Sequence, residues 1–417
     1  SITSPQLESM SRGRDFDLGN GKMYHPPEEP LYMDSKLGYG HNPLKIGQAL
    51  GCYRIVRKLG WSTASSVWLC EDTRNTEKTY VVFKVLTRWA TSACIHEISS
   101  EYHALDKIRS ANVSHPGFPH CLHLLAQFWI EKTVLDGGHI CFVTGVLGSD
   151  LNALRASQPD QKFSVSVATR IVKQILLALD YLHRECGFIH TDIKMDNILV
   201  LPPDQSAQCI EPYLQEHPAE TYEPLIDTNV WPDPIITVRS QPLPDFGLDP
   251  SLQNLNITLI DYGQSVAINA PFDLDSTLQP LIIRAPEVTL GCSWSPSMDI
   301  WTVGCLAFEL LNTGHLFAQY GSSFSIPHQL HQIAEYIGPF EQSFLSRCKH
   351  RDKYFDANGT LGPVADFTPS TLEIILEQYG TNSPDSVARF MRRSLTLDPE
   401  LRPSAAELLE DEWLNNV

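Results

Sequence analysis

A polar stretch, HTDIKMDN at 190–197, lies between two short apolar runs, FI before it and ILV after it. Short apolar runs of this kind are typical of buried strands, so the stretch is predicted to form a loop held by two strands. Asp192 offers a carboxylate that can accept a proton from a hydroxyl, Lys194 a cation that can neutralise a phosphate, and Asn197 a carboxamide that can hold a metal ion. An ordinary surface loop is the alternative, which the flanking apolar runs disfavour.

Further motifs follow in order along the chain. Lys84 is the single cation of a β-branched run, VVFKVL at 81–86, and Asp261 ends an apolar run within LIDYG at 259–263. The motifs APE, DIW and LDPELRP come at 285–287, 299–301 and 397–403. Each motif is weak alone, but their order over more than 300 residues resembles the motif set of protein kinases. The resemblance implies an α+β fold with a small β-rich lobe and a larger, mainly helical lobe.

The resemblance also implies a reaction, the transfer of the γ-phosphoryl group of Mg-ATP to a protein hydroxyl. Asp192 would orient the hydroxyl and accept its proton, and Lys194 would stabilise the γ-phosphoryl group in transit. Asn197 and Asp261 would hold Mg²⁺, and Lys84 would bind the α- and β-phosphates of ATP. Glu287 and Arg402 would form an ion pair that holds the helical lobe together.

Several longer segments narrow the resemblance to the serine/arginine-protein kinases, and in particular to their fungal members. These segments are GYGHNPLKIG at 38–47, YRIVRKLGW at 53–61, SSVWL at 65–69, HICFV at 139–143 with VLG at 146–148, and HTDIK at 190–194. The resemblance spans about residues 38–414 and implies a serine/threonine kinase with protein substrates, Arg- and Ser-rich proteins among them.

In such kinases a glutamate pulls the phosphate-binding lysine into place. Glu97 is preferred for this role, because HEI at 96–98 resembles the DEI of the family, and Glu101 is the alternative one turn away. Thr144 would be a small gatekeeper behind the adenine. The residues expected to contact ATP are Leu59, Gly60, Trp61, Ser62, Val67, Lys84, Thr144, Leu147 and Leu199.

Three departures from the family pattern bear on activity and specificity. Ser62 replaces the second glycine of the phosphate-covering loop, and its Cβ should weaken ATP binding or turnover. The segment 320–334 has no acidic residue with which to dock an Arg-rich substrate, and Leu281 stands where the family has Arg. The altered phosphate-covering loop motivates the alternative, a catalytically weak pseudokinase that acts as a scaffold. A small-molecule kinase of the same fold is disfavoured by the APE motif.

Thr191 stands where most kinases carry an Arg. That Arg pairs with a phosphate on the activation segment, and Thr cannot make the bidentate contact. The sequence therefore predicts a kinase that is active without activation-loop phosphorylation, although a merely tolerated replacement is the alternative.

The composition fits a soluble globular enzyme. The 417 residues are 42% apolar and carry a formal net charge of −18, which argues against direct nucleic-acid or anionic-membrane binding. Acidity that serves solubility alone is the simpler explanation of the charge. No apolar run reaches the roughly 20 residues of a bilayer span. The ten cysteines form no C-x-x-C pair, which favours a reduced setting in the cytoplasm or nucleus. We expect a monomer.

The order of patterns predicts the domain organisation. Residues 1–37 are expected to be a flexible lead-in, 53–147 the β-rich lobe with one helix at about 91–109, and 148–417 the helical lobe. Residues 201–256 contain ten prolines between two strands of a hairpin. A stretch so rich in proline is expected to form neither sheet nor helix, and so to be a partly disordered spacer.

Overall fold

The chain folds into two compact units in this computed structural model. The residues described are 16–17, 23–24, 26–31, 33, 35–74, 76–133, 137–226, 234–271, 274–275, 278–317, 325–364, 369–378 and 384–415. The first unit, called here the sheet unit, comprises Ser1–Arg109, Leu122–Ser149 and Val200–Pro250. The second, the helical unit, comprises Ser110–Cys121, Asp150–Leu199 and Ser251–Val417.

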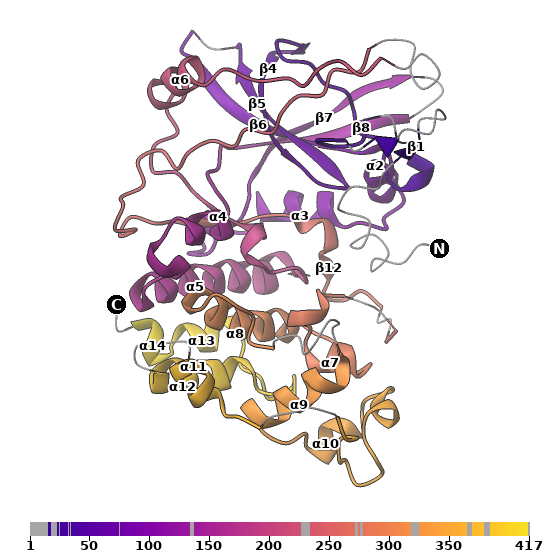
Figure 1. Ribbon diagram of the computed structural model, residues 1–417, viewed down its shortest axis with the longest axis vertical. Coiled ribbons are helices and arrows are strands. Elements are labelled where there is room, and N and C mark those ends of the chain that lie inside the picture. Colours follow the sequence, from indigo (N-terminus) through magenta and orange to yellow (C-terminus); the bar gives the residue numbers. More distant parts are fainter. Residues whose placement is uncertain are drawn as a thin grey trace. The chain divides into compact units, whose positions relative to one another are not determined.

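The sheet unit is built on one antiparallel sheet (Figure 1). Its strand order is β3 (Ala49–Leu50), β4 (Tyr53–Trp61), β5 (Ser65–Asp72), β6 (Thr79–Leu86), β8 (Gly137–Thr144) and β7 (Leu124–Thr133). A further pair, β1 (Phe16–Asp17) and β2 (Met23–Tyr24), is also antiparallel. Aromatic rings fill the core, with Phe83 edge-on to Tyr53 at 5.0 Å and to Phe128 at 5.2 Å between ring centroids.

The helix expected at 91–109 is two helices, α2 (Arg88–Ile95) and α3 (Glu101–Ile108). The Thr87 hydroxyl caps α2 by accepting a hydrogen bond from the backbone N–H of Ala90 at 3.2 Å. Between the helices Glu97 has a φ of +56°, a left-handed conformation that ends the first helix.

The helical unit is organised around two buried helices, α5 (Val165–Asp180) and α8 (Ser297–Leu311), which pack on each other. The apolar side chains of α5 at 167, 171, 175 and 179, one every four residues, are all buried, so they form the core-facing side of this helix. The remaining helices are α4 (Leu151–Ala156), α7 (Pro286–Thr289), α9 (Ile326–Tyr336), α10 (Gln342–Leu345), α11 (Leu372–Gln378), α12 (Pro384–Ser394), α13 (Ala405–Leu409) and α14 (Glu412–Asn415). Two short strand pairs join β9 (Phe188–Ile189) to β12 (Val266–Ala267) and β10 (Ile198–Val200) to β11 (Ile257–Leu259).

A buried ion pair expected from the sequence is present in the helical unit. Arg402 donates to both carboxylate oxygens of Glu287, at 2.7 and 3.0 Å, and neither side chain is exposed. The guanidinium also lies over the ring of Trp301, 5.2 Å from its centroid. This bidentate geometry fixes α7 against the segment before α13.

The proline-rich insertion is mostly folded, contrary to expectation. It forms α6 (Ala207–Glu216) in spite of Pro212, and Ile210 and Leu243 are buried in one apolar cluster with residues of the sheet. Val238 joins the core cluster around Tyr53. Proline content alone predicts a spacer, but the apolar residues at 210, 213 and 214 lie on one face of a short helix and indicate a packed segment. Residues 227–233 lie outside the described part of the insertion.

A buried charge cluster joins the lead-in, β4 and the insertion. Lys58 Nζ has no exposure and contacts the carboxylates of Glu28, at 3.0 Å, and Glu29. Ser240 donates to Glu28 from its backbone N–H at 2.8 Å and from its hydroxyl at 2.6 Å. Glu28 and Glu29 are buried, so this part of the expected flexible lead-in is fixed, whereas residues 1–15 lie outside the description.

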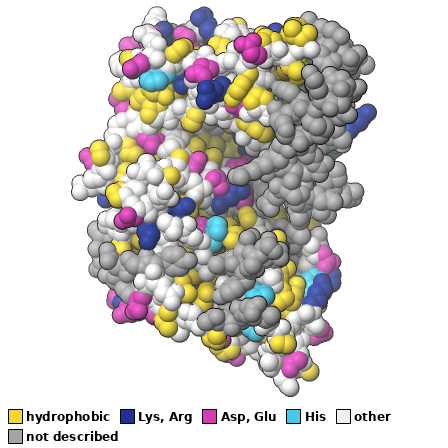
Figure 2. Space-filling view, viewed as in Figure 1, with side chains coloured by type: hydrophobic (Ala, Val, Ile, Leu, Met, Phe, Trp, Pro, Cys, Tyr) yellow, Lys and Arg dark blue, Asp and Glu magenta, His cyan; other side chains and the backbone are white. Residues whose placement is uncertain are grey.

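Charge is spread over the surface. On the described part of the face in Figure 2, acidic and basic side chains are interspersed with apolar ones, so the net charge of −18 forms no single acidic field there. No helix among the described residues has both the length and the apolar content needed to cross a bilayer.

The folded insertion predicts a stability effect. Ile210→Ala should lower the free energy of unfolding by about 2–4 kcal/mol, because it leaves a cavity in the cluster formed with Leu69 and Val82. Chemical denaturation of the purified protein measures the loss. Ile226→Ala, in the same insertion but with Ile226 72% exposed, is the matched control and should change stability by less than about 0.5 kcal/mol. Equal stability of the two variants would contradict a structural role for the insertion.

Candidate active site

Lys84, the lysine expected to bind the phosphates, is held by an ion pair within the sheet unit. Lys84 lies on β6, and its Nζ contacts Glu101 Oε1 of α3 at 2.5 Å. The exposed fractions of the two side chains are 19% and 7%, so the pair is largely shielded from water. Lys84 is directly opposite Val67 of β5, one of the residues expected to contact the adenine.

The partner of Lys84 is Glu101 and not the expected Glu97. Glu97 is exposed and lies in the break between α2 and α3, so the two glutamates do not share a helix face. The sequence contains a signal for this arrangement that the motif comparison overlooked. Ser99 and Ser100 precede Glu101, and serines followed by an acid are typical of a helix start, where the acid faces the positive end of the helix dipole.

The loop between β4 and β5 is a tight turn anchored at Ser62. Its backbone N–H donates to Ser65 O at 2.8 Å, and its hydroxyl lies 3.2 Å both from Ser65 Oγ and from the Ala64 N–H that donates to it. Burial lowers the pKa of His41 to about 4, so the neutral ring donates from Nε2 to Ser62 O at 2.9 Å. The serine that replaces glycine therefore takes part in the structure of this turn.

The residues expected to contact ATP come from both units. Leu59, Gly60 and Trp61 are on β4, Val67 is on β5 and Thr144 ends β8, all in the sheet unit, with Leu147 just beyond. Leu199 is on β10 in the helical unit. Leu59 and Val67 are partly buried against the cluster that contains Val82 and Val146. Their contact with adenine remains a prediction.

The polar residues of the 190–197 loop converge within the helical unit. Asp192 Oδ2 lies 3.0 Å from Lys194 Nζ and accepts a hydrogen bond from Asn197 Nδ2 at 2.9 Å. Burial acts to lower the pKa of Lys194, but the attraction of the Asp192 carboxylate, with smaller contributions from Asp196 and Asp261, raises it overall. Lys194 is therefore a charged group in the site, as the spacing of the motif predicts.

A buried aspartate holds this loop in shape. Asp299 at the start of α8 has no exposure and accepts hydrogen bonds from the backbone N–H groups of His190, at 2.8 Å, and Thr191, at 2.9 Å. His183 Nε2 contacts the same carboxylate at 2.8 Å. Thr191 has a φ of +71°, a strained conformation that these bonds maintain. The DIW motif pointed to this region of the sequence without indicating its role.

Asp261 follows the strand that runs beside the loop. The backbone N–H of Ile260 donates to Asn197 O at 2.9 Å, and Asp261 itself has a φ of +64°. Asn197 donates to Asp192 with its amide nitrogen, so its amide oxygen is the atom that it can offer to a cation. Carboxylate and amide oxygens suit Mg²⁺, which takes its remaining ligands from water and nucleotide phosphates. The donor set fits an ion bound together with ATP.

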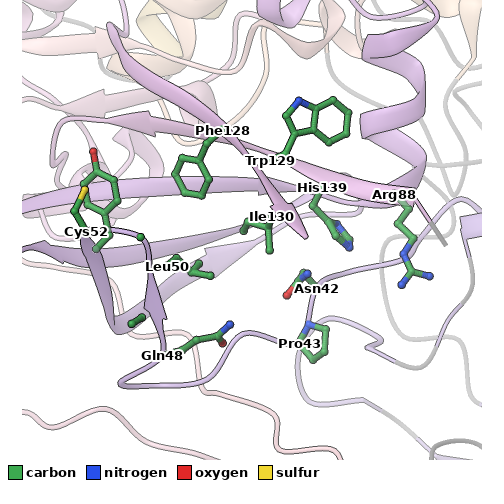
Figure 3. A pocket seen from close by; sticks show the side chains of 13 residues that line it. Asn42, Pro43, Gln48, Leu50, Cys52, Arg88, Phe128, Trp129, Ile130 and His139 are labelled. Atoms are coloured by element: carbon green, nitrogen blue, oxygen red, sulfur yellow. The ribbon is translucent and has the colours of Figure 1, made fainter. Parts of the chain in front are cut away.

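Two further features of the described residues concern metal binding and the location of a cavity. Among the described residues no group of three or more His, Cys, Asp or Glu is placed to hold a metal by itself. A cavity of about 790 Å³ lies in the sheet unit between Asn42, Leu50 and Trp129 (Figure 3). Its lining contains none of the residues expected to contact ATP or to act in phosphoryl transfer.

Known proteins match this arrangement over most of the chain. The protein kinase domain family matches residues 53–210 and 249–414, and thus omits most of the insertion. A serine/threonine protein kinase of Aspergillus fumigatus is 30% identical, with 89% of this chain and 87% of the relative covered. Serine/threonine-protein kinase SRPK of Physarum polycephalum is 28% identical (92% and 91% covered), and SRSF protein kinase 3 of Mus musculus is 24% identical (90% and 89% covered). The chain therefore belongs to the protein kinase family and is a serine/threonine protein kinase of the SR-protein kinase type.

Proposed function

We propose that this kinase phosphorylates serine and threonine hydroxyls of Arg- and Ser-rich proteins, uses Mg-ATP, and is active without phosphorylation of its own activation segment. The observation that carries the proposal is the assembled group of Asp192, Lys194 and Asn197. The substrate class is supported by the name of the relative SRSF protein kinase 3 and by the HTDIK segment.

The geometry suggests how each side chain contributes. Asp192 orients the substrate hydroxyl and accepts its proton as the new oxygen–phosphorus bond forms and the bond to ADP breaks. Lys194 offsets the negative charge that develops on the transferred group, and the Glu101 carboxylate holds Lys84 in position for the α- and β-phosphates. Mg²⁺, held by Asn197 and Asp261, would neutralise phosphate charge.

Thr191 supports activity without activation-loop phosphorylation. Its side chain is buried, and its hydroxyl donates to Gln264 O at 2.8 Å, just after the Asp261 segment. This neutral hydrogen bond connects the catalytic loop to the activation segment where other kinases need an Arg–phosphate pair. The contact requires no added charge.

The scaffold alternative rests on Ser62 alone. The residues expected to act in transfer are present in the sequence, and Lys194 and Asn197 each lie within hydrogen-bonding distance of Asp192. The Ser62 side chain is accommodated in an ordered turn. A catalytic kinase is therefore the better interpretation.

Loss of the catalytic carboxylate tests the activity. Asp192→Asn should reduce kcat by a factor of about 10²–10⁴, because the substrate hydroxyl loses its proton acceptor. Radiolabelled phosphate transfer to a basic protein gives the rate, and a thermal melt shows that the variant is folded. Asp196→Asn, the same change at an exposed position of the same loop, is the control and should retain at least half of the activity.

Two results would contradict the proposal. Equal rates for Asp192→Asn and the parent would remove the kinase assignment. A loss of more than about tenfold in rate when the parent enzyme is first treated with a phosphatase would remove activation-loop independence, since a neutral Thr191 contact cannot be lost in this way.

The two glutamates near Lys84 give a paired prediction. Glu101→Gln should lower kcat/KM for ATP by about 10- to 100-fold, because Lys84 loses the charge that holds it. Glu97→Gln should stay within about twofold of the parent, because Glu97 is exposed and outside the pair. Steady-state kinetics at varied ATP separate the two. The reverse order of effects would restore Glu97 as the partner.

Substrate class is tested with matched peptides. A Ser-Arg repeat peptide should be phosphorylated with a kcat/KM at least about tenfold higher than a Ser-Lys peptide of equal charge, because only Arg offers a planar bidentate fork. Similar values for both would show that charge alone matters. Failure on both peptides with activity on other proteins would overturn the proposed substrate class and leave the kinase assignment intact.

A further inference from the structure

An aspartate of the insertion binds the segment that follows β8. The backbone N–H of Ser149 donates to Asp245 Oδ1 at 2.7 Å, and the Ser149 hydroxyl donates to Asp245 Oδ2 at 2.7 Å. Hydrogen bonds to a carboxylate are stronger than those between neutral groups, and here both oxygens of one carboxylate bind the same residue. Both residues belong to the sheet unit. The insertion therefore holds the chain at Ser149.

The Asp245 carboxylate also lies against the backbone of Gly148. A Cβ at position 148 would overlap this carboxylate, so glycine permits the close approach. Gly148 donates its backbone N–H to Val200 O at 2.9 Å, and Val200 donates its own to Ser149 O at 2.9 Å. Residues 148–149 are thus held both by the end of β10 and by Asp245.

Apolar contacts on both sides of Asp245 fix its position. Leu243 is buried, and Phe246 is partly buried, in the cluster that contains Val146 of the held segment. The Phe246 ring is edge-on to that of Tyr213 in α6, with 5.7 Å between the ring centroids. Because these neighbours are packed against the sheet, the carboxylate is in place before any ligand binds.

The held segment adjoins residues that are expected to contact ATP. Leu147 immediately precedes Gly148, and Thr144 ends the strand before it. A segment that is already fixed loses less conformational entropy when a ligand binds, so its affinity for the ligand is higher. Asp245 lies between the two ranges that match the protein kinase domain family, 53–210 and 249–414. The contact is therefore supplied by the insertion and not by the matched domain.

We propose that Asp245 is a positioning residue for ATP, which acts through Ser149 to hold residues 147–149 in the conformation that binds the nucleotide. Asp245 acts on this segment and not by contact with ATP. The role rests on the use of ATP in the proposed function and is independent of the substrate class.

Nucleotide affinity of the full chain tests this role. Asp245→Ala should raise the Kd of Mg-ADP, measured by calorimetry, and the KM for ATP by about 5- to 10-fold, because Ser149 loses both acceptors. The kcat at saturating ATP should stay within about twofold of the parent, because bound nucleotide orders the segment again. Asp245→Asn keeps an acceptor for the Ser149 N–H and should recover most of the affinity. Glu223→Ala, at an exposed position of the same insertion, is the control.

Gly148 provides a coupled test of the contact. Gly148→Ala should weaken Mg-ADP binding at least about tenfold in the parent, because the new Cβ displaces the Asp245 carboxylate. The same change added to Asp245→Ala should cost less than about threefold, because the overlap is gone. Equal losses in the two backgrounds would overturn the proposal.

Thermal melts separate positioning from a purely structural role. If Asp245→Ala lowers the Tm and leaves the Kd of Mg-ADP unchanged, the proposal is wrong. Ser149→Ala removes only the hydroxyl bond and should raise the Kd by about two- to threefold, which keeps the test decisive if Asp245→Ala does not fold. If Asp245→Ala weakens Mg-ADP binding but the parent phosphorylates no protein, the positioning role stands and the proposed function fails.

Discussion

The carboxylate of Asp299 is the interaction on which the active-site loop depends. The Asp299 side chain is not exposed to water, yet it accepts hydrogen bonds from the backbone N–H groups of His190 and Thr191 and contacts the ring of His183. A buried carboxylate is costly to desolvate unless such donors surround it. Asp299 cannot move away from this loop, because the helix that carries it, α8, is almost wholly buried. The left-handed φ of Thr191 is therefore maintained by the core of the helical unit rather than by the loop itself.

The catalytic-loop and strand motifs can be predicted from the sequence because the residues of each motif lie close together along the chain. The spacing of Asp192, Lys194 and Asn197 within one loop is enough to bring them together, and the ladder confirms the strand around Lys84. Glu287 and Arg402 are far apart in sequence, and their pairing could be predicted only because the family resemblance supplied it. The adenine contacts could not be derived from sequence spacing either, because they depend on residues from both units.

The expectations that failed concern segments in which tertiary packing outweighs composition. Proline content suggested a spacer at 201–256, but the burial of Ile210 and Leu243 against the sheet stabilises a short helix that propensity disfavours. The choice between Glu97 and Glu101 depended on whether one helix or two spans 88–108, a boundary set by a few residues around Ser99.

The buried cluster around Lys58 has a consequence for synthesis of the chain. The hydrogen bonds between Glu28 and Ser240 join groups 212 residues apart, and the residues between them include the whole catalytic loop. A loop of this length must close before the stabilising contacts at its ends can form, and the entropy cost of closure slows folding. The sheet unit thus cannot complete its core on the ribosome until residues beyond 243 have emerged, by which time part of the helical unit has already been made.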